Sequence, residues 1–110
     1  MGPPEISEID ADELAVCMDE GGRLVDVREP DEYVAGHVPG AVSVPLVTVP
    51  DRLDAFAGDG PTYVICQAGG RSRRACELVA AHGIDAVNVA GGTGAWLRSG
   101  RPVVVGSRPS

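Results

Sequence analysis

Apolar residues follow two different patterns along the chain, and these patterns indicate helical and strand segments. The first helical segment carries four apolar residues at the i, i+3, i+4, i+7 spacing of one helical face: Ala11, Leu14, Ala15 and Met18. Asp10 and Glu13 stand where a capping box places its two side chains, so we expect this helix to begin at Asp10. Gly21 and Gly22 then favour a left-handed stop.

Short apolar runs between the helical segments indicate buried strands. These runs are rich in β-branched residues and lie at 23–27, 41–44, 63–65 and 87–89. Further helical segments are expected at 30–33, 48–57 and 72–82 and around Trp96. Strands and helices that alternate in this way predict an α/β fold with a mostly parallel sheet and helices on both faces. Such sheets bind ligands at the carboxyl ends of their strands.

Length and composition fit one domain. The 110 residues, 44% of them hydrophobic, supply one compact core and leave no room for a second domain. We expect this domain to cover residues 5–104, with flexible ends at 1–4 and 105–110. No apolar stretch approaches the roughly 20 residues of a membrane-spanning helix, and residues 1–5 lack the features of a signal peptide. A soluble cytoplasmic protein without a membrane partner is therefore expected.

The formal net charge of −7 is concentrated at the start of the chain. Seven acidic residues precede the first basic residue, Arg23: Glu5, Glu8, Asp10, Asp12, Glu13, Asp19 and Glu20. From residue 21 onward, nine acidic residues balance nine arginines. Proteins that bind nucleic acid carry a basic face, so this distribution argues against a nucleic-acid partner and indicates a solvated acidic surface.

The three cysteines, Cys17, Cys66 and Cys76, form no CxxC pair and do not suit the even-numbered disulfide frameworks of small secreted proteins. Reduced thiols are therefore expected. Cys17 and Cys76 lie on predicted helices and should pack in the core, as free cysteines usually do. The alternative for Cys76, one helical turn beyond Ser72, is a resolving thiol that forms a disulfide with Cys66.

Cys66 stands at the place where a parallel sheet binds ligands. It immediately follows the strand-like run 63–65 and precedes a predicted helix, so it faces a helix N-terminus. Residues 68–70 are small and let backbone amides turn inward around one central atom. These amides, the positive end of the helix and Arg71 favour a thiolate over a thiol. Such a cysteine is a nucleophile for a sulfur donor, and the same amides can hold the resulting persulfide.

The loop Cys66-Gln67-Ala68-Gly69-Gly70-Arg71-Ser72 resembles the active-site loop of the rhodanese family. Two segments before it resemble the family's first motif: Asp26-Val27-Arg28-Glu29 with Glu32, and Gly36-His37-Val38-Pro39-Gly40-Ala41. Another group of residues resembles its closing motif: Gly91-Gly92 with Trp96, Gly100 and Pro102. The resemblance covers the chain from about Glu5 to Pro102.

This resemblance implies a single-domain rhodanese-like fold with a five-stranded parallel sheet. It implies that Cys66 carries sulfur as a persulfide inside a substrate-binding loop of six residues: Gln67, Ala68, Gly69, Gly70, Arg71 and Ser72. Ser72 would also cap the following helix. The implied activity is a sulfurtransferase without metal or organic cofactor. Thiosulfate or a similar donor leaves its outer sulfur on Cys66, and a thiol, cyanide or a protein acceptor removes it.

Residues outside the loop are expected to support it. Asp26 and Arg28 lie at the end of a neighbouring predicted strand and can brace the loop by charge-assisted hydrogen bonds, a supporting role rather than contact with substrate. Arg73 and Arg74 add positive charge beyond the loop. A structural role is expected for His37, because a thiol that is already ionised hardly requires a general base.

Two alternative functions stay open. A cysteine-dependent phosphatase or arsenate reductase also holds a thiolate among amides, but its loop resembles His-Cys-x5-Arg, whereas here Ile65 precedes Cys66 and four residues separate Cys66 from Arg71. A relay or non-enzymatic rhodanese module, which binds a specific protein partner, can keep both the fold and the cysteine. A thiosulfate:cyanide assay with a Cys66→Ser control discriminates between this module and the enzyme.

Overall fold

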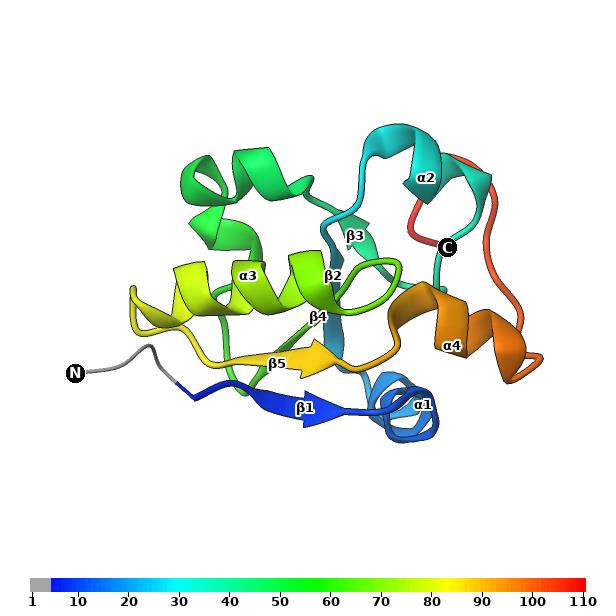
Figure 1. Ribbon diagram of the computed structural model, residues 1–110, viewed down its shortest axis with the longest axis horizontal. Coiled ribbons are helices and arrows are strands. Elements are labelled where there is room, and N and C mark those ends of the chain that lie inside the picture. Colours follow the sequence, from blue (N-terminus) through cyan, green and yellow to red (C-terminus); the bar gives the residue numbers. More distant parts are fainter. Residues whose placement is uncertain (1–4) are drawn as a thin grey trace.

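Five parallel strands form a single sheet in the order β1-β5-β4-β2-β3 (Figure 1). The strands run over Ser7–Ile9 (β1), Arg23–Asp26 (β2), Val42–Ser43 (β3), Thr62–Ile65 (β4) and Ala86–Val89 (β5). The computed structural model describes residues 5–110. The predicted α/β fold with a five-stranded parallel sheet is confirmed.

Helices cover both faces of this sheet, as expected. They run over Ala11–Asp19 (α1), Pro30–Ala35 (α2), Gly70–Ala80 (α3) and Gly92–Arg98 (α4), with 3-10 helices at Leu46–Asp51 (η1) and Leu53–Ala55 (η2). Helix α3 and the two 3-10 helices pack on one face, and α1, α2 and α4 pack on the other (Figure 1). Among the described residues, no helix combines the length and the apolar character needed to cross a lipid bilayer.

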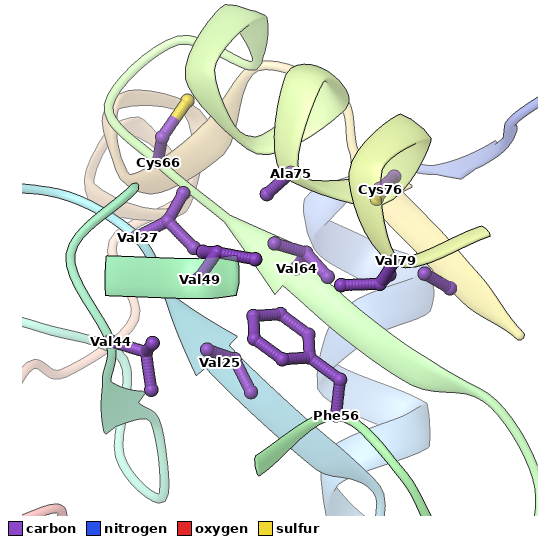
Figure 2. Packing of buried hydrophobic residues seen from close by; sticks show 11 residues of the cluster. Val25, Val27, Val44, Val49, Phe56, Val64, Cys66, Ala75, Cys76 and Val79 are labelled. Carbon is purple, nitrogen blue, oxygen red and sulfur yellow. The ribbon is translucent and has the colours of Figure 1, made fainter. Parts of the chain in front are cut away.

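Each face of the sheet has its own hydrophobic core, because successive residues of a strand point to opposite sides. Val25 and Val64 pack against Phe56 and the inner side of α3 (Figure 2). Leu24 and Ile65, their neighbours in the strands, pack against α1 and α4. Cys66 belongs to the first core, and in Figure 2 its sulfur atom points away from the packed side chains.

Two segments differ from the expectation based on apolar pattern. Strand β1 was not identified from the pattern, because it is a sheet edge of three largely exposed residues and carries little apolar signal. The helix expected over 48–57 is replaced by η1 and η2. Pro50 lies inside η1 and has no N–H for a helical hydrogen bond, and the β-branched residues Val47 to Val49 favour a helix only weakly.

The end of the chain is bound to the domain. The Gly106 N–H donates to the Val34 carbonyl at 2.9 Å, and the Gly40 N–H donates to the Pro109 carbonyl at 2.8 Å. Nε2 of the buried His37 lies 2.7 Å from the Arg108 carbonyl oxygen. Residues 105–110, which the sequence predicts to be a flexible end, thus include three residues that make hydrogen bonds to the domain. The other expected flexible end, 1–4, lies outside the described residues.

Candidate active site

The site forms where the connections of the sheet diverge. Strand β2 continues through α2 on one face, whereas its neighbour β4 continues through α3 on the other face. The two loops therefore separate and leave a crevice above the carboxyl ends of β2 and β4, as in other parallel sheets. Cys66 is the first residue after β4, and Arg28 follows the end of β2.

The loop after β4 brings hydrogen-bond donors around the Cys66 sulfur. Gly69 has a φ of 110°, in the left-handed region, and precedes the first residue of α3. This turn directs the Gly69 N–H toward Sγ of Cys66, with N and Sγ 3.1 Å apart. The Ser72 hydroxyl oxygen lies 3.2 Å from the same sulfur. Cys66 is 1% exposed, so the sulfur is recessed.

These donors change the acidity of the thiol. Burial raises the pKa of Cys66, but hydrogen bonds from the Ser72 hydroxyl and from the amides of Ser72, Gly69 and Ala68 outweigh burial. The net effect lowers the pKa below its ordinary value of 9.0. The arrangement thus favours a thiolate, which is the reactive form of a cysteine.

Ser72 does not have the capping role that the family resemblance implies. Helix α3 begins at Gly70 with Gly69 at its cap position, so Ser72 already lies inside the first turn. Its side chain is buried and faces Cys66 on one side and Asn88 on the other. The left-handed turn at Gly69 starts the helix three residues earlier than a cap at Ser72 would.

Asn88 and Glu8 also approach the site, although no motif in the sequence predicts either of them there. Asn88 lies on β5 with its Oδ1 atom 2.5 Å from the Ser72 hydroxyl oxygen. Its Nδ2 donates to Oε2 of Glu8 at 2.7 Å and to the Gly69 carbonyl at 3.1 Å. A polar residue inside the predicted strand 87–89 was the available signal, since a buried amide needs partners.

The N-terminus of α4 supports the loop from the other side. The Thr93 N–H donates to the Cys66 carbonyl at 2.9 Å, and the Gly94 N–H donates to the Gln67 carbonyl at 3.1 Å. Gly92 has a φ of 55° and lies so close that a Cβ atom there would be 2.6 Å from the Gln67 carbonyl oxygen. The glycines of the closing motif thus allow two backbones to meet.

Arg28 connects the end of β2 to the loop. Its guanidinium donates to both carboxylate oxygens of Asp26, with NH2 at 2.9 Å from Oδ2, and also to the Gly36 carbonyl at 2.8 Å. NH1 lies 3.3 Å from Oε1 of Gln67. Asp26 is 0% and Arg28 is 4% exposed, so this pair is desolvated and its partners are fixed.

Arg71 points to an acid rather than to the sulfur. It donates to Glu32 through two bonds, 2.7 Å from NH1 to Oε1 and 3.0 Å from NH2 to Oε2. These bonds hold the pKa of Glu32 at about 2, and they raise the pKa of Arg71. The positive charge expected from Arg71 is therefore balanced by Glu32.

The other chemically reactive side chains lie away from this crevice. Cys76 is buried in the core as expected, and burial raises its pKa to about 12. Cys17 is only half-buried, in contrast to the expectation, and lines a separate cavity with Tyr63. His37 is buried between backbone carbonyls, which fits its expected structural role. Within residues 5–110, no three His, Cys, Asp or Glu side chains are grouped as metal ligands would be.

Fold and site together thus define the class of protein: a parallel α/β domain in which a cysteine after a central strand accepts hydrogen bonds from backbone amides. Residues 10–99 match the family model of the Rhodanese-like domain, and the chain belongs to this family. A sulfurtransferase of Allochromatium vinosum is 34% identical over 102 residues, which cover 90% of this chain and 95% of that protein.

Solved structures agree. A rhodanese-like domain protein of Staphylococcus aureus superimposes with a TM-score of 0.78 at 40% identity, over 83% of this chain and 91% of that chain. A thiosulfate sulfurtransferase of Pseudomonas aeruginosa gives a TM-score of 0.84 at 28% identity, over 96% of this chain but 21% of that one. These similarities support a role in sulfur transfer.

We predict that Arg28→Ala lowers the free energy of unfolding by about 3–5 kcal/mol, because it leaves the Asp26 carboxylate buried without its partner. Urea unfolding followed by circular dichroism measures this change. The matched control is Arg52→Ala, which breaks the exposed pair with Asp54 and should cost no more than about 1 kcal/mol. Equal losses in the two variants would contradict the prediction.

Gly92→Ala should lower the rate of sulfur transfer about 10- to 100-fold, because the added Cβ displaces the loop backbone that carries the reactive cysteine. Gly100→Ala is the control: Gly100 also has a positive φ, of 79°, but a Cβ there meets no atom within 4 Å. Both variants carry the cost of a left-handed alanine, about 1–2 kcal/mol. Only Gly92→Ala should lose activity in single-turnover assays.

The Glu32–Arg71 pair predicts a pH dependence of stability. The folded protein holds the Glu32 pKa at about 2, below the ordinary 4.5, so the pair stabilises the fold fully above pH 4.5. This contribution should disappear as the pH falls from about 4.5 to about 2. Unfolding free energies measured across this window should fall less steeply for Glu32→Gln than for the wild type. Parallel curves would show that Glu32 does not contribute.

Proposed function

We propose that this protein is a sulfurtransferase in which Cys66 carries sulfur as a persulfide between a small donor and an acceptor. The observation that supports this most strongly is the environment of the Cys66 sulfur. The sulfur accepts a hydrogen bond from the Gly69 amide and lies beside the Ser72 hydroxyl in a recessed loop. These groups lower the pKa of the thiol although it is buried. A buried thiol with a lowered pKa is unusual for a structural cysteine and suits a nucleophile.

The proposed cycle has two displacement steps, and neither needs an external oxidant or reductant. In the first, the Cys66 thiolate attacks the outer sulfur of thiosulfate or a similar donor. A new S–S bond forms, the old bond to that sulfur breaks, and sulfite leaves with the electron pair. In the second, a thiolate or cyanide attacks the outer sulfur of the persulfide, and Cys66 regains its thiolate.

The donors around Cys66 suit both states of this cycle. A thiolate and a persulfide each carry one negative charge, so amide and hydroxyl groups that stabilise the first can stabilise the second without changing their own protonation. The recessed position limits water around the sulfur, which strengthens these hydrogen bonds. This geometry supports the proposal that Cys66, with the donors of Gly69 and Ser72, forms the active site.

The geometry argues against a phosphatase or an arsenate reductase. In such enzymes an arginine at the end of the loop must face the oxyanion, but Arg71 is committed to Glu32 by two hydrogen bonds. Only four residues lie between Cys66 and Arg71, so the ring of amides is short. A single outer sulfur atom fits this smaller ring better than a group with four oxygens.

A protein acceptor is the further candidate within the same chemistry. The recessed sulfur requires an acceptor group that reaches into the loop, and an extended protein segment could supply one as a small thiol does. The three described cysteines are free, which suits a reducing compartment, and a cytoplasmic location stays a prediction. Turnover with thiosulfate and cyanide would favour the enzyme, whereas sulfur loading without turnover would favour a relay.

The test of the proposed function is the mass of the intact protein after treatment with thiosulfate. We expect one added sulfur atom that maps to Cys66 and is removed by cyanide, and we expect Cys66→Ser to gain none while keeping its fold. Cys17→Ser is the control and should load sulfur like the wild type. Loading that persists in Cys66→Ser, or that maps to another cysteine, would refute the mechanism.

A further inference from the structure

A chain of hydrogen bonds leads from the Cys66 sulfur to the edge of the sheet. Ser72 Oγ lies 3.2 Å from Sγ and 2.5 Å from Oδ1 of Asn88, and Asn88 in turn donates to Glu8 at 2.7 Å. Ser72 and Asn88 are 0% and 1% exposed, so solvent does not compete for the bonds that join Cys66, Ser72 and Asn88, whereas Glu8 is exposed at the sheet edge. The sheet creates the last link, because the parallel register pairs Glu8 of β1 with Asn88 of β5 and places both side chains on one face.

The orientation of the Asn88 amide follows from its partners. The two neighbours of Nδ2 are the Glu8 carboxylate and the Gly69 carbonyl, and both can only accept. A flipped amide would place Oδ1 against two acceptors and lose both bonds. Oδ1 must therefore face Ser72, as an acceptor.

This orientation gives the Ser72 hydroxyl two competing acceptors for one hydrogen. When Cys66 is a thiol, its S–H can donate to Ser72 Oγ while the Ser72 O–H donates to Oδ1 of Asn88, and every group is satisfied. When Cys66 loses its proton to solvent, the Ser72 hydrogen can turn to the negative sulfur, and Oδ1 then loses its donor. Ser72 stabilises the ionised sulfur, whereas Asn88 stabilises the protonated one.

We propose that Asn88 is a positioning residue for Cys66, which acts through Ser72 by competing with the sulfur for the single hydroxyl hydrogen. The proposal rests on the proposed function in so far as Cys66 is the reacting group. Asn88 thereby allows the Ser72 hydroxyl to take two orientations. In one the hydroxyl accepts a hydrogen bond from the Cys66 thiol, and in the other it donates to the charged sulfur. Glu8 takes part by fixing the orientation of the Asn88 amide.

Charged and titratable groups from the surrounding elements also face this part of the site. They are Glu8 on β1, Asp26 at the end of β2, Arg28 just after it, Glu32 on α2, and Arg71, Arg73 and Cys76 on α3. Arg28 and Arg71 are each paired with an acid, and Arg73 lies 3.6 Å from Glu8. Their charges therefore partly cancel near the sulfur, which leaves the Ser72 hydrogen as a local control of its protonation.

The experiment measures the pKa of Cys66 from the rate of alkylation by iodoacetamide as a function of pH. Trypsin cuts after Arg23, Arg71 and Arg74, so the three cysteines fall in separate peptides and Cys66 is read alone by mass spectrometry. Ser72→Ala should raise the pKa by about one unit, because a hydrogen bond to the charged sulfur is lost. Asn88→Leu, which keeps the branched shape without the acceptor, should lower it by about half a unit or more.

The double variant decides whether Asn88 acts through Ser72. Without the hydroxyl, Asn88 has no hydrogen to compete for, so Ser72→Ala with Asn88→Leu should match Ser72→Ala within about 0.3 units. A pKa that Asn88→Leu raises or leaves unchanged would overturn the proposal, and so would additive shifts in the double variant. Asn88→Val, which suits a strand, is the second variant if the leucine protein does not fold.

Glu8→Gln separates positioning from charge. Its amide oxygen can still accept from Asn88, so the Cys66 pKa should stay within about 0.2 units of the wild type, whereas a direct effect of the carboxylate charge would shift it further. A shift as large as that of Asn88→Leu would contradict the proposal. Alkylation does not require sulfur transfer, so the two proposals can fail separately. If the Cys66 pKa does not shift in these variants although the protein loads sulfur on Cys66, only this inference is overturned. If Cys66 loads no sulfur, the proposed function is overturned.

Discussion

The site depends on two hydrogen bonds between carbonyl groups of the Cys66 loop and the N-terminus of helix α4. The carbonyls of Cys66 and Gln67 accept hydrogen bonds from the first turn of α4, at 2.9 Å and 3.1 Å. A trans peptide is planar, so the N–H that follows each carbonyl points in the opposite direction. The Ala68 N–H is therefore turned away from α4 and toward the sulfur, where it lowers the pKa of the Cys66 thiol. The contact between α4 and the loop thus helps to orient an amide that lowers the pKa of Cys66.

The sheet makes this contact possible by bringing distant segments together. Strand β4 lies between β2 and β5, so the loop that follows it is flanked by Arg28 on one side and by the start of α4 on the other. Gly92 permits the close approach of the two backbones. Because the supports come from three elements, the loop is fixed from several directions, which is the condition for a preorganised anion site.

The sequence predicted the parts of the site that are local in the chain. The strand, the small residues and the helix after Cys66 stand within about a dozen positions, so their pattern indicated the fold and the loop. The hydrogen bonds that join Ser72 to Asn88 and Asn88 to Glu8 could not be predicted in the same way. They depend on the pairing of β5 with β4 and with β1, and β1 is too short and too exposed to have a pattern of its own. Partners 80 positions apart leave no local signal.

The electrostatic effect of the arginines near Cys66 was the property that the sequence predicted least well, because it depends on which acidic side chain pairs with each of them. Arg71 looks like a cation beside a thiolate, yet the fold places Glu32 against it. The same holds for Arg28, which is held by Asp26. With these cations matched, dipoles of neutral amides and one hydroxyl stabilise the charge on sulfur. Neutral donors do not titrate near neutral pH, so in the proposed sulfur-transfer cycle they would stabilise the thiolate and the persulfide in turn without exchanging protons with solvent.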